Sequence, residues 1–152
     1  MARLALDKAR AVATRLGEGI VLGADTVVAL DGEALGKPAS PADARVMLRR
    51  LRGREHEVIT GVAVVDAQTG RAERTAVTSR VRMADYGERE IEAYVAGGEP
   101  LDKAGAYAIQ GAGGALVAGY EGSYSNVVGL PLAETARLLA AFGVAVSAPS
   151  AC

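Results

Sequence analysis

The stretch from Ile20 to Val28 constrains the fold most, because its apolar residues predict a buried strand that contains a single carboxylate. Gly23 and Ala24 precede that carboxylate, Asp25, and the strand pattern resumes directly after it. A carboxylate between apolar flanks costs free energy unless it is neutralised, hydrogen-bonded or bound to a cation. The small residues before it leave room for another part of the protein to approach the backbone. Asp25 is therefore either a functional acid or a carboxylate that bonds a neighbouring loop amide.

Length and composition exclude several classes of protein. The 152 residues fit one domain with a sizeable core, which we expect over residues 1–144 with a flexible tail over 145–152. The 17 basic and 18 acidic residues nearly cancel, which argues against a polybasic nucleic-acid surface. The only cysteine is Cys152, so a disulfide framework and a thiolate zinc site are excluded. No apolar run approaches the roughly 18 residues that cross a bilayer. Because charged residues near the start also do not fit a secretory signal, we expect a cytoplasmic protein without a membrane or nucleic-acid partner.

Apolar periodicity and turn residues predict an α/β fold. The predicted helices cover residues 2–16, 41–52, 87–96 and 131–142. The predicted strands cover residues 20–28, 33–35, 56–65, 71–83 and 115–120, with a tight turn at Asp31 and Gly32. We expect the first helix to bury Ala5, Ala9, Val12 and Leu16, and the last helix to bury Leu132, Leu138, Leu139 and Phe142.

Two groups of polar residues have ordinary structural explanations. The second predicted helix and its exit carry five arginines, namely Arg45, Arg49, Arg50, Arg52 and Arg54. We interpret them as a solvated face rather than a ligand site. His56 is the only histidine and has no second metal ligand or nucleophile placed by a known motif, so we interpret it as structural.

The stretch from Glu99 to Gly111 differs from the rest of the chain, because carboxylates, a lysine and a glutamine follow one another among small residues without a clear period. Such loops on a rigid scaffold often hold polyanionic ligands, since glycine and alanine let backbone N–H groups approach phosphates. The stretch lacks the lysine-and-hydroxyl ending of a P-loop, and the glycines after it do not match the dinucleotide fingerprint.

Taken in order, several motifs resemble the Maf nucleotide pyrophosphatases over residues 4–139. They are Leu-x-x-x-Lys-Ala, Gly-Ala-Asp-Thr-Val-Val, Gly-Lys-Pro, Gly-Glu-Pro-x-Asp-Lys-Ala-Gly-Ala-Tyr, Ile-Gln-Gly and Gly-Ser-Tyr-Ser-Asn-Val-Val-Gly-Leu-Pro. The resemblance implies an α/β fold with an elongated mixed sheet and two lobes around a nucleotide-binding cleft. It also implies hydrolysis of a nucleoside triphosphate to the monophosphate and pyrophosphate with a divalent metal cation, Mg or Mn. We further expect a homodimer.

The same resemblance assigns roles to particular residues. Asp25 would be the catalytic acidic residue, and Thr26 with Gln110 would place the chain in the branch that acts on dTTP and UTP. The chemistry agrees, because carboxylates suit a metal or a general base and lysines suit a phosphate tail. The candidate metal residues are Asp25, Glu99 and Asp102. The candidate substrate-binding residues are Lys8, Thr26, Lys37, Lys103 and Gln110.

The sequence departs from the family pattern at its start. Family members open with a strand and a Ser-x-Ser-Pro-Arg-Arg loop that contacts the triphosphate, whereas the printed sequence begins at the helix that follows. We therefore expect weak pyrimidine triphosphate binding with little turnover, and lower stability than in a chain that carries the segment. Two alternatives stay open: a non-catalytic nucleotide-binding regulator of septum formation, and a house-cleaning pyrophosphatase for other altered nucleotides.

Overall fold

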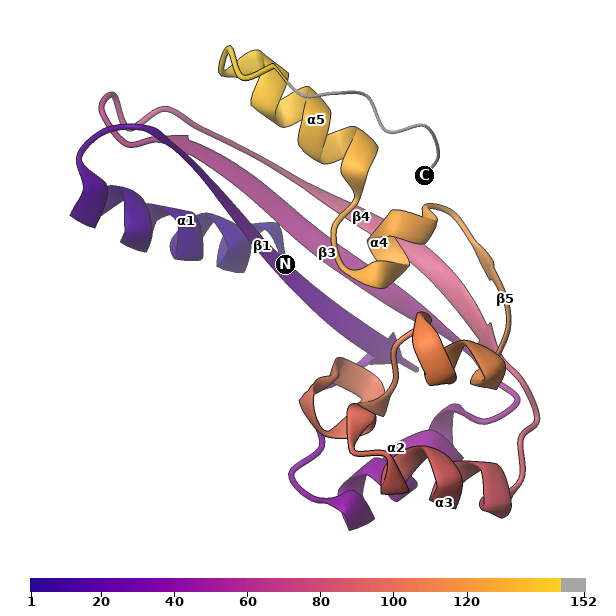
Figure 1. The fold of residues 1–152 in the computed structure, drawn as a ribbon. Coiled ribbons are helices and arrows are strands. Elements are labelled where there is room, and N and C mark those ends of the chain that lie inside the picture. Colours follow the sequence, from indigo (N-terminus) through magenta and orange to yellow (C-terminus); the bar gives the residue numbers. More distant parts are fainter. Residues whose placement is uncertain (146–152) are drawn as a thin grey trace. The chain divides into compact units, whose positions relative to one another are not determined.

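The computed structural model describes residues 1–145, so the tail predicted at 145–152 lies outside the described residues except for its first position (Figure 1). The α-helices are α1 (Ala2–Leu16), α2 (Pro41–Leu51), α3 (Glu88–Ala96), α4 (Tyr124–Val128) and α5 (Leu132–Ala141). Three short 3-10 helices are η1 (Glu99–Asp102), η2 (Ala104–Ala106) and η3 (Gly111–Leu116). The strands are β1 (Ile20–Leu30), β2 (Glu33–Leu35), β3 (Glu55–Asp66), β4 (Ala72–Met83) and β5 (Val117–Glu121). Over the described part of the chain, no helix is long and apolar enough to cross a membrane.

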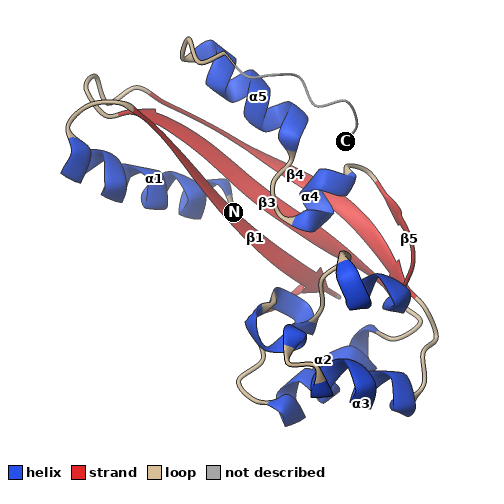
Figure 2. Cartoon of the chain, in the orientation of Figure 1, coloured by secondary structure: helices blue, strands red, loops and turns tan. Residues whose placement is uncertain are grey.

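The strands form one five-stranded sheet in the order β2-β1-β3-β4-β5, with helices around it (Figure 2). This confirms the predicted α/β class. The sheet is antiparallel, however, where the resemblance implied a mixed sheet. Short turns join β1 to β2 and β3 to β4, as antiparallel neighbours allow. Longer segments that contain helices join the other neighbouring strands. At the turn between β1 and β2, Asp31 and Gly32 have φ angles of 52° and 79°, which is the left-handed backbone that a tight hairpin requires.

The chain divides into two compact units. The first unit contains Met1–Thr26, Ile59–Thr78 and the residues from Ser123 onward, and the second contains Val27–Val58 and Ser79–Gly122. Strands β1, β3 and β4 therefore contribute residues to both units. The predicted cleft between two lobes stays a prediction.

In the first unit, α1 packs closely on β1 and β3 through two glycines. A Cβ atom at Gly23 would clash with the backbone of α1 at Ala5, and one at Gly61 would clash with Met1. Alanines on the helix and small or branched residues on the strands complete this core, whose buried members are Ala5, Leu6, Ala9, Ala13, Val21, Ala63 and Val65. The predicted helix limits are confirmed, and Gly17 ends the helix in the left-handed conformation at φ 73°. The prediction that Leu16 is buried is wrong, because it lies on the last turn and is 59% exposed.

The last helix of this unit also differs from expectation. Helix α5 exists where predicted, but Thr135 is its one buried residue, Leu132 is exposed and the other expected core residues are only half-buried. Apolar spacing predicts which residues share a helix face, whereas the depth of burial depends on what packs against that face.

In the second unit, α2 packs against α3 and the short helices η1 and η2. Helix α2 begins as predicted, because Ser40 accepts a hydrogen bond from the Asp43 backbone N–H at 3.1 Å and Pro41 occupies the first turn. Each of the five arginines on and after this helix forms an ion pair with a carboxylate of the same unit. Their interpretation as a solvated face rather than a ligand site stays a prediction.

Candidate functional site

Asp25 lies on β1 in the first unit, and its carboxylate is paired with a lysine. The Asp25 side chain is 19% exposed, and its Oδ1 accepts a hydrogen bond from Lys8 Nζ at 2.7 Å. Of the two sequence-based alternatives, the loop amide is therefore not the partner; the partner is a cation from α1. The carboxylate is mostly buried, whereas the Lys8 side chain is 58% exposed, so the pair is open to solvent on the lysine side. Because only Oδ1 is engaged, the second oxygen of the carboxylate remains available as an acceptor.

The close packing of α1 on β1 explains this pair. Because Gly23 has no side chain, the helix backbone at Ala5 and Ala9 lies directly against the strand. Gly23 and Asp25 share one face of β1, since alternate residues of a strand point the same way. Lys8 lies on the same turn of α1 as the helix residues that touch Gly23, so its amine reaches the carboxylate two residues further along the strand.

Thr26 follows Asp25 and points to the opposite face of β1. Its hydroxyl donates to the Gly129 carbonyl at 3.2 Å and lies 2.9 Å from the hydroxyl of Thr60, which is fully buried. A hydroxyl has one proton, so Thr26 accepts from Thr60 when it donates to Gly129. Thr26 thereby ties β1 to β3 and to the turn that follows α4.

The remaining predicted site residues lie in the second unit. Lys37 is exposed and lies next to Gly36, whose carbonyl accepts a hydrogen bond from the Gly105 N–H at 3.1 Å. This bond joins the Gly-Lys-Pro turn to the segment that follows Lys103. The Lys103 amine lies 3.6 Å from the carboxylate of Asp102, and both side chains are substantially exposed. The structure thus pairs Lys8 with Asp25 in one unit, where Thr26 lies on the opposite face of β1, and places the other five predicted residues in the other unit.

Glu99 and Gln110 differ in whether their side chains form hydrogen bonds. Glu99 is half-buried and accepts a hydrogen bond from the Tyr94 hydroxyl at 2.9 Å. Burial raises the pKa of Tyr94 well above its usual range, so the phenol keeps its proton and acts as the donor. Gln110 is exposed, and its side-chain amide forms no hydrogen bond within residues 1–145. Its amide therefore remains available to a ligand.

The buried residues His56 and Tyr107 contact each other. The sequence predicted a structural role for His56 but did not predict its partner. His56 Nε2 lies 2.6 Å from the Tyr107 hydroxyl, and the two rings meet edge to face at a centroid distance of 5.4 Å. Burial lowers the pKa of His56 to about 4, so the ring is neutral at pH 7. The structural interpretation of His56 is consistent with this burial. The sequence analysis assigned no role to Tyr107. Its place at the end of the Ala-Gly-Ala-Tyr motif, shortly before Gln110, was a signal.

The fit of a divalent cation depends on how many protein ligands it needs. Among residues 1–145 there is no cluster of three or more His, Cys, Asp or Glu side chains that could hold a metal. Magnesium usually needs only one or two carboxylates, because substrate phosphates and water supply the other ligands. Asp25 fits that requirement, since only its Oδ1 takes part in a hydrogen bond.

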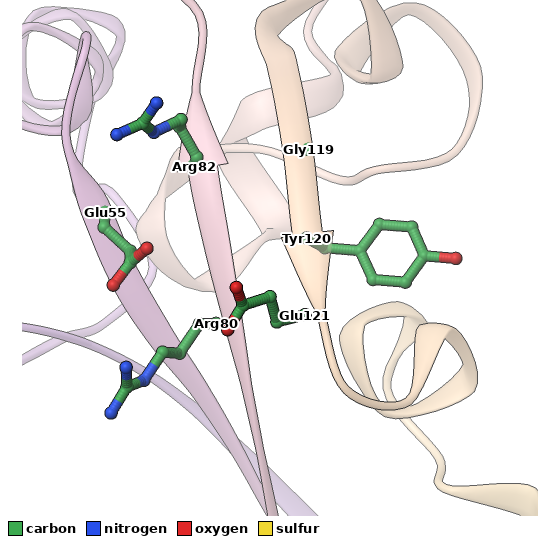
Figure 3. Close-up of a pocket in the computed structure, with 6 residues that line it drawn as sticks. All are labelled: Glu55, Arg80, Arg82, Gly119, Tyr120 and Glu121. Carbon is green, nitrogen blue, oxygen red and sulfur yellow. The ribbon is translucent and has the colours of Figure 1, made fainter.

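A shallow pocket in the second unit lies apart from these predicted residues. It is lined by Glu55, Arg80, Arg82, Gly119, Tyr120 and Glu121 (Figure 3). In Figure 3 the side chains of Arg80 and Arg82 extend to the same side of β4 as Glu55, whereas Tyr120 points away from them. The pocket mixes two cations with two carboxylates, so its charge does not favour a polyanion over other ligands.

The comparisons with known proteins agree with the motifs. The family model for Maf-like proteins matches residues 1–142. The chain is 60% identical to the dTTP/UTP pyrophosphatase of Moorella thermoacetica over 147 residues, covering 94% of this chain and 74% of the relative. It is 51% identical to the protein of the same name from Dictyoglomus thermophilum, covering 91% and 72%, and 54% identical to that of Symbiobacterium thermophilum, covering 93% and 72%. The motifs, the α/β fold and these matches lead to one conclusion: the chain belongs to the Maf family.

Proposed function

We propose that this chain is a nucleoside triphosphate pyrophosphatase that hydrolyses dTTP and UTP to the monophosphate and pyrophosphate. The observation that carries the proposal is the shielded Asp25 carboxylate, which Lys8 holds in place on a strand that α1 packs against directly. Relatives named dTTP/UTP pyrophosphatase at 51–60% identity support the substrate class.

In the proposed reaction, Asp25 acts as the general base that orients the attacking water and accepts its proton, or it would serve as a ligand of a divalent cation. Lys8 pairs with the carboxylate through its Oδ1 at 2.7 Å. A divalent cation, Mg or Mn, would neutralise charge on the phosphate oxygens when bound. We propose Asp25 as the cation ligand of the first unit and Asp102 as a candidate cation ligand of the second unit. Glu99 is the weaker candidate, because one of its oxygens already accepts from Tyr94.

Substrate recognition is proposed to lie mainly with residues of the second unit. Lys37 and Lys103 are exposed or half-exposed amines suited to the triphosphate as point charges. Gln110 carries a donor and an acceptor on one amide, which matches the edge of a uracil or thymine ring. The Thr26 hydroxyl is engaged by Thr60 and Gly129, so we propose that it influences base choice through the segment it holds.

For the assembly and location we propose a homodimer in the cytoplasm, as the sequence predicts. Sedimentation analysis of the purified chain tests the dimer.

The test of the activity is pyrophosphate release by the purified chain from dTTP, UTP, CTP and GTP with Mg²⁺. We expect release to be greatest with dTTP and UTP, and to fall about 10²-fold or more in Asp25→Asn. Nucleotide binding without any pyrophosphate release would contradict the proposal and favour the regulator alternative. Release that is faster from modified nucleotides than from dTTP and UTP would favour the house-cleaning alternative.

A further inference from the structure

The loop from Lys103 to Gly114, here called the Gln110 loop, is held by hydrogen bonds to three separate parts of the second unit. It carries Lys103 and Gln110, the two predicted ligand-binding residues of this segment. Residues of the loop that make these bonds are buried or half-buried, whereas Gln110 itself is exposed. The loop is thus anchored on both sides of Gln110, whose side chain is exposed and available to bind a ligand.

The first anchor lies at the start of the loop. The Gly105 N–H donates to the Gly36 carbonyl at 3.1 Å, and Gly105 packs so closely on Val28 that a Cβ atom there would lie 3.1–3.3 Å from the Val28 side chain. The next residue, Ala106, is fully buried and has a φ of 70°, which is unfavourable for alanine. Strained backbone of this kind persists only where the surrounding contacts determine it.

The second anchor is the hydrogen bond between Tyr107 and His56. Burial raises the pKa of Tyr107 and lowers that of His56, so both side chains are neutral. If Tyr107 donates to Nε2, the Nδ1 proton is the one group left without a partner in the described residues. The other tautomer would leave two groups without partners, namely Nδ1 and the phenol proton. The phenol is therefore the donor, and it fixes the loop backbone three residues before Gln110.

The third anchor is the hydroxyl of Tyr94. It accepts a hydrogen bond from the Ala108 N–H at 3.1 Å and donates to Glu99 at 2.9 Å, so both of its roles are used. Gly113 lies against the same hydroxyl and against the Ala108 carbonyl, and a Cβ atom at Gly113 would clash with both. The two ends of the turn around Gln110 thus meet at one phenol oxygen.

We propose that Tyr94 and Tyr107 are positioning residues for Gln110, and that discrimination between uracil and cytosine depends on their hydroxyls. This inference rests on the proposed function, in which Gln110 contacts the base. Uracil and cytosine differ in the donors and acceptors on one ring edge, so an amide distinguishes them only if its orientation is fixed. Neither tyrosine touches the ligand in this account. Their hydroxyls act by holding the loop backbone on both sides of Gln110.

The experiment measures the dissociation constants of UTP and CTP by calorimetry for the full chain and four variants. Tyr94→Phe and Tyr107→Phe each remove one hydroxyl and keep the ring. Tyr86→Phe is the matched control, because the Tyr86 hydroxyl is also buried and donates to the Leu48 carbonyl at 2.6 Å, outside the loop. Gln110→Ala tests the glutamine itself. Melting temperatures are recorded for every variant.

We expect Tyr94→Phe and Tyr107→Phe to lower the ratio of the CTP to the UTP dissociation constant about tenfold, as Gln110→Ala does. Tyr86→Phe should lower the melting temperature to a similar extent and leave the ratio within about twofold of the parent. An unchanged ratio in both loop variants, or an equal fall in Tyr86→Phe, would overturn the positioning role. If Gln110→Ala leaves the ratio unchanged, both this inference and the proposed base contact of Gln110 are wrong. The hydrolytic activity is judged separately, by pyrophosphate release.

Discussion

The buried imidazole of His56 makes the stability of the fold sensitive to acid. Its pKa is about 4 in the folded chain, because the ring is 2% exposed and burial disfavours the charged form, whereas an unfolded histidine has a pKa near 6.5. Above pH 6.5 the ring is neutral in both states, and this stability is fully present. Between pH 6.5 and 4 the unfolded chain takes up a proton that the folded chain does not, so stability falls as the pH falls.

The size of the effect follows from the difference between the two pKa values. A difference of about 2.5 pKa units corresponds to about 3 kcal/mol, with a maximal slope of about 1.4 kcal/mol per pH unit. This loss is a substantial fraction of the unfolding free energy of about 5–15 kcal/mol that is typical of natural domains. Carboxylates that are ion-paired in the folded state, such as Glu88 with its lowered pKa beside Arg49, add their own loss at lower pH.

The assay is urea unfolding at a series of pH values from 4.5 to 7.5, for the parent chain and for His56→Gln. Glutamine offers Tyr107 a hydrogen-bond acceptor and does not titrate, so the variant shares every pH-dependent term except that of His56. The free energy of unfolding of the parent should fall relative to that of the variant by about 2–3 kcal/mol between pH 7 and 4.5. Parallel curves for the two proteins over this range would refute the reasoning, whatever constant offset separates them.

Three further predictions concern the proposed site. Asp25→Asn should lower pyrophosphate release about 10²-fold or more with an unchanged circular dichroism spectrum, and near-parent release would end the catalytic assignment. Gly23→Ala should destabilise the fold by about 1–3 kcal/mol, since the new methyl group meets the α1 backbone, whereas Gly36→Ala, which meets open space, should melt close to the parent. Thr26→Gln combined with Gln110→Glu should weaken hydrolysis of dTTP and UTP more than that of purine triphosphates, by roughly 1–3 kcal/mol for each hydrogen bond lost. A uniform loss across all bases would speak against a role of Thr26 and Gln110 in base choice.

The sequence by itself determined the elements whose limits depend on local chemistry. The turn at Asp31 and Gly32, the end of α1 at Gly17 and the start of α2 at Ser40 lie where the sequence predicts them. Each is set by a residue that tolerates left-handed backbone or supplies a capping oxygen, and neither property needs the rest of the fold. The motif around Asp25 likewise identified the family, and its apolar flanks indicated a carboxylate in need of a partner.

Only the tertiary structure decided which groups meet. The partner of Asp25 is a lysine 17 residues earlier in the chain, and it reaches the carboxylate because Gly23 lets α1 pack on the strand. The contact between His56 and Tyr107 joins residues 51 positions apart, so no local pattern contains it. The same holds for α5, whose apolar residues lie at helical spacing yet remain half-buried or exposed. Local residue preferences act over a few neighbours, whereas burial and side-chain pairing are set by packing between segments that are distant in sequence.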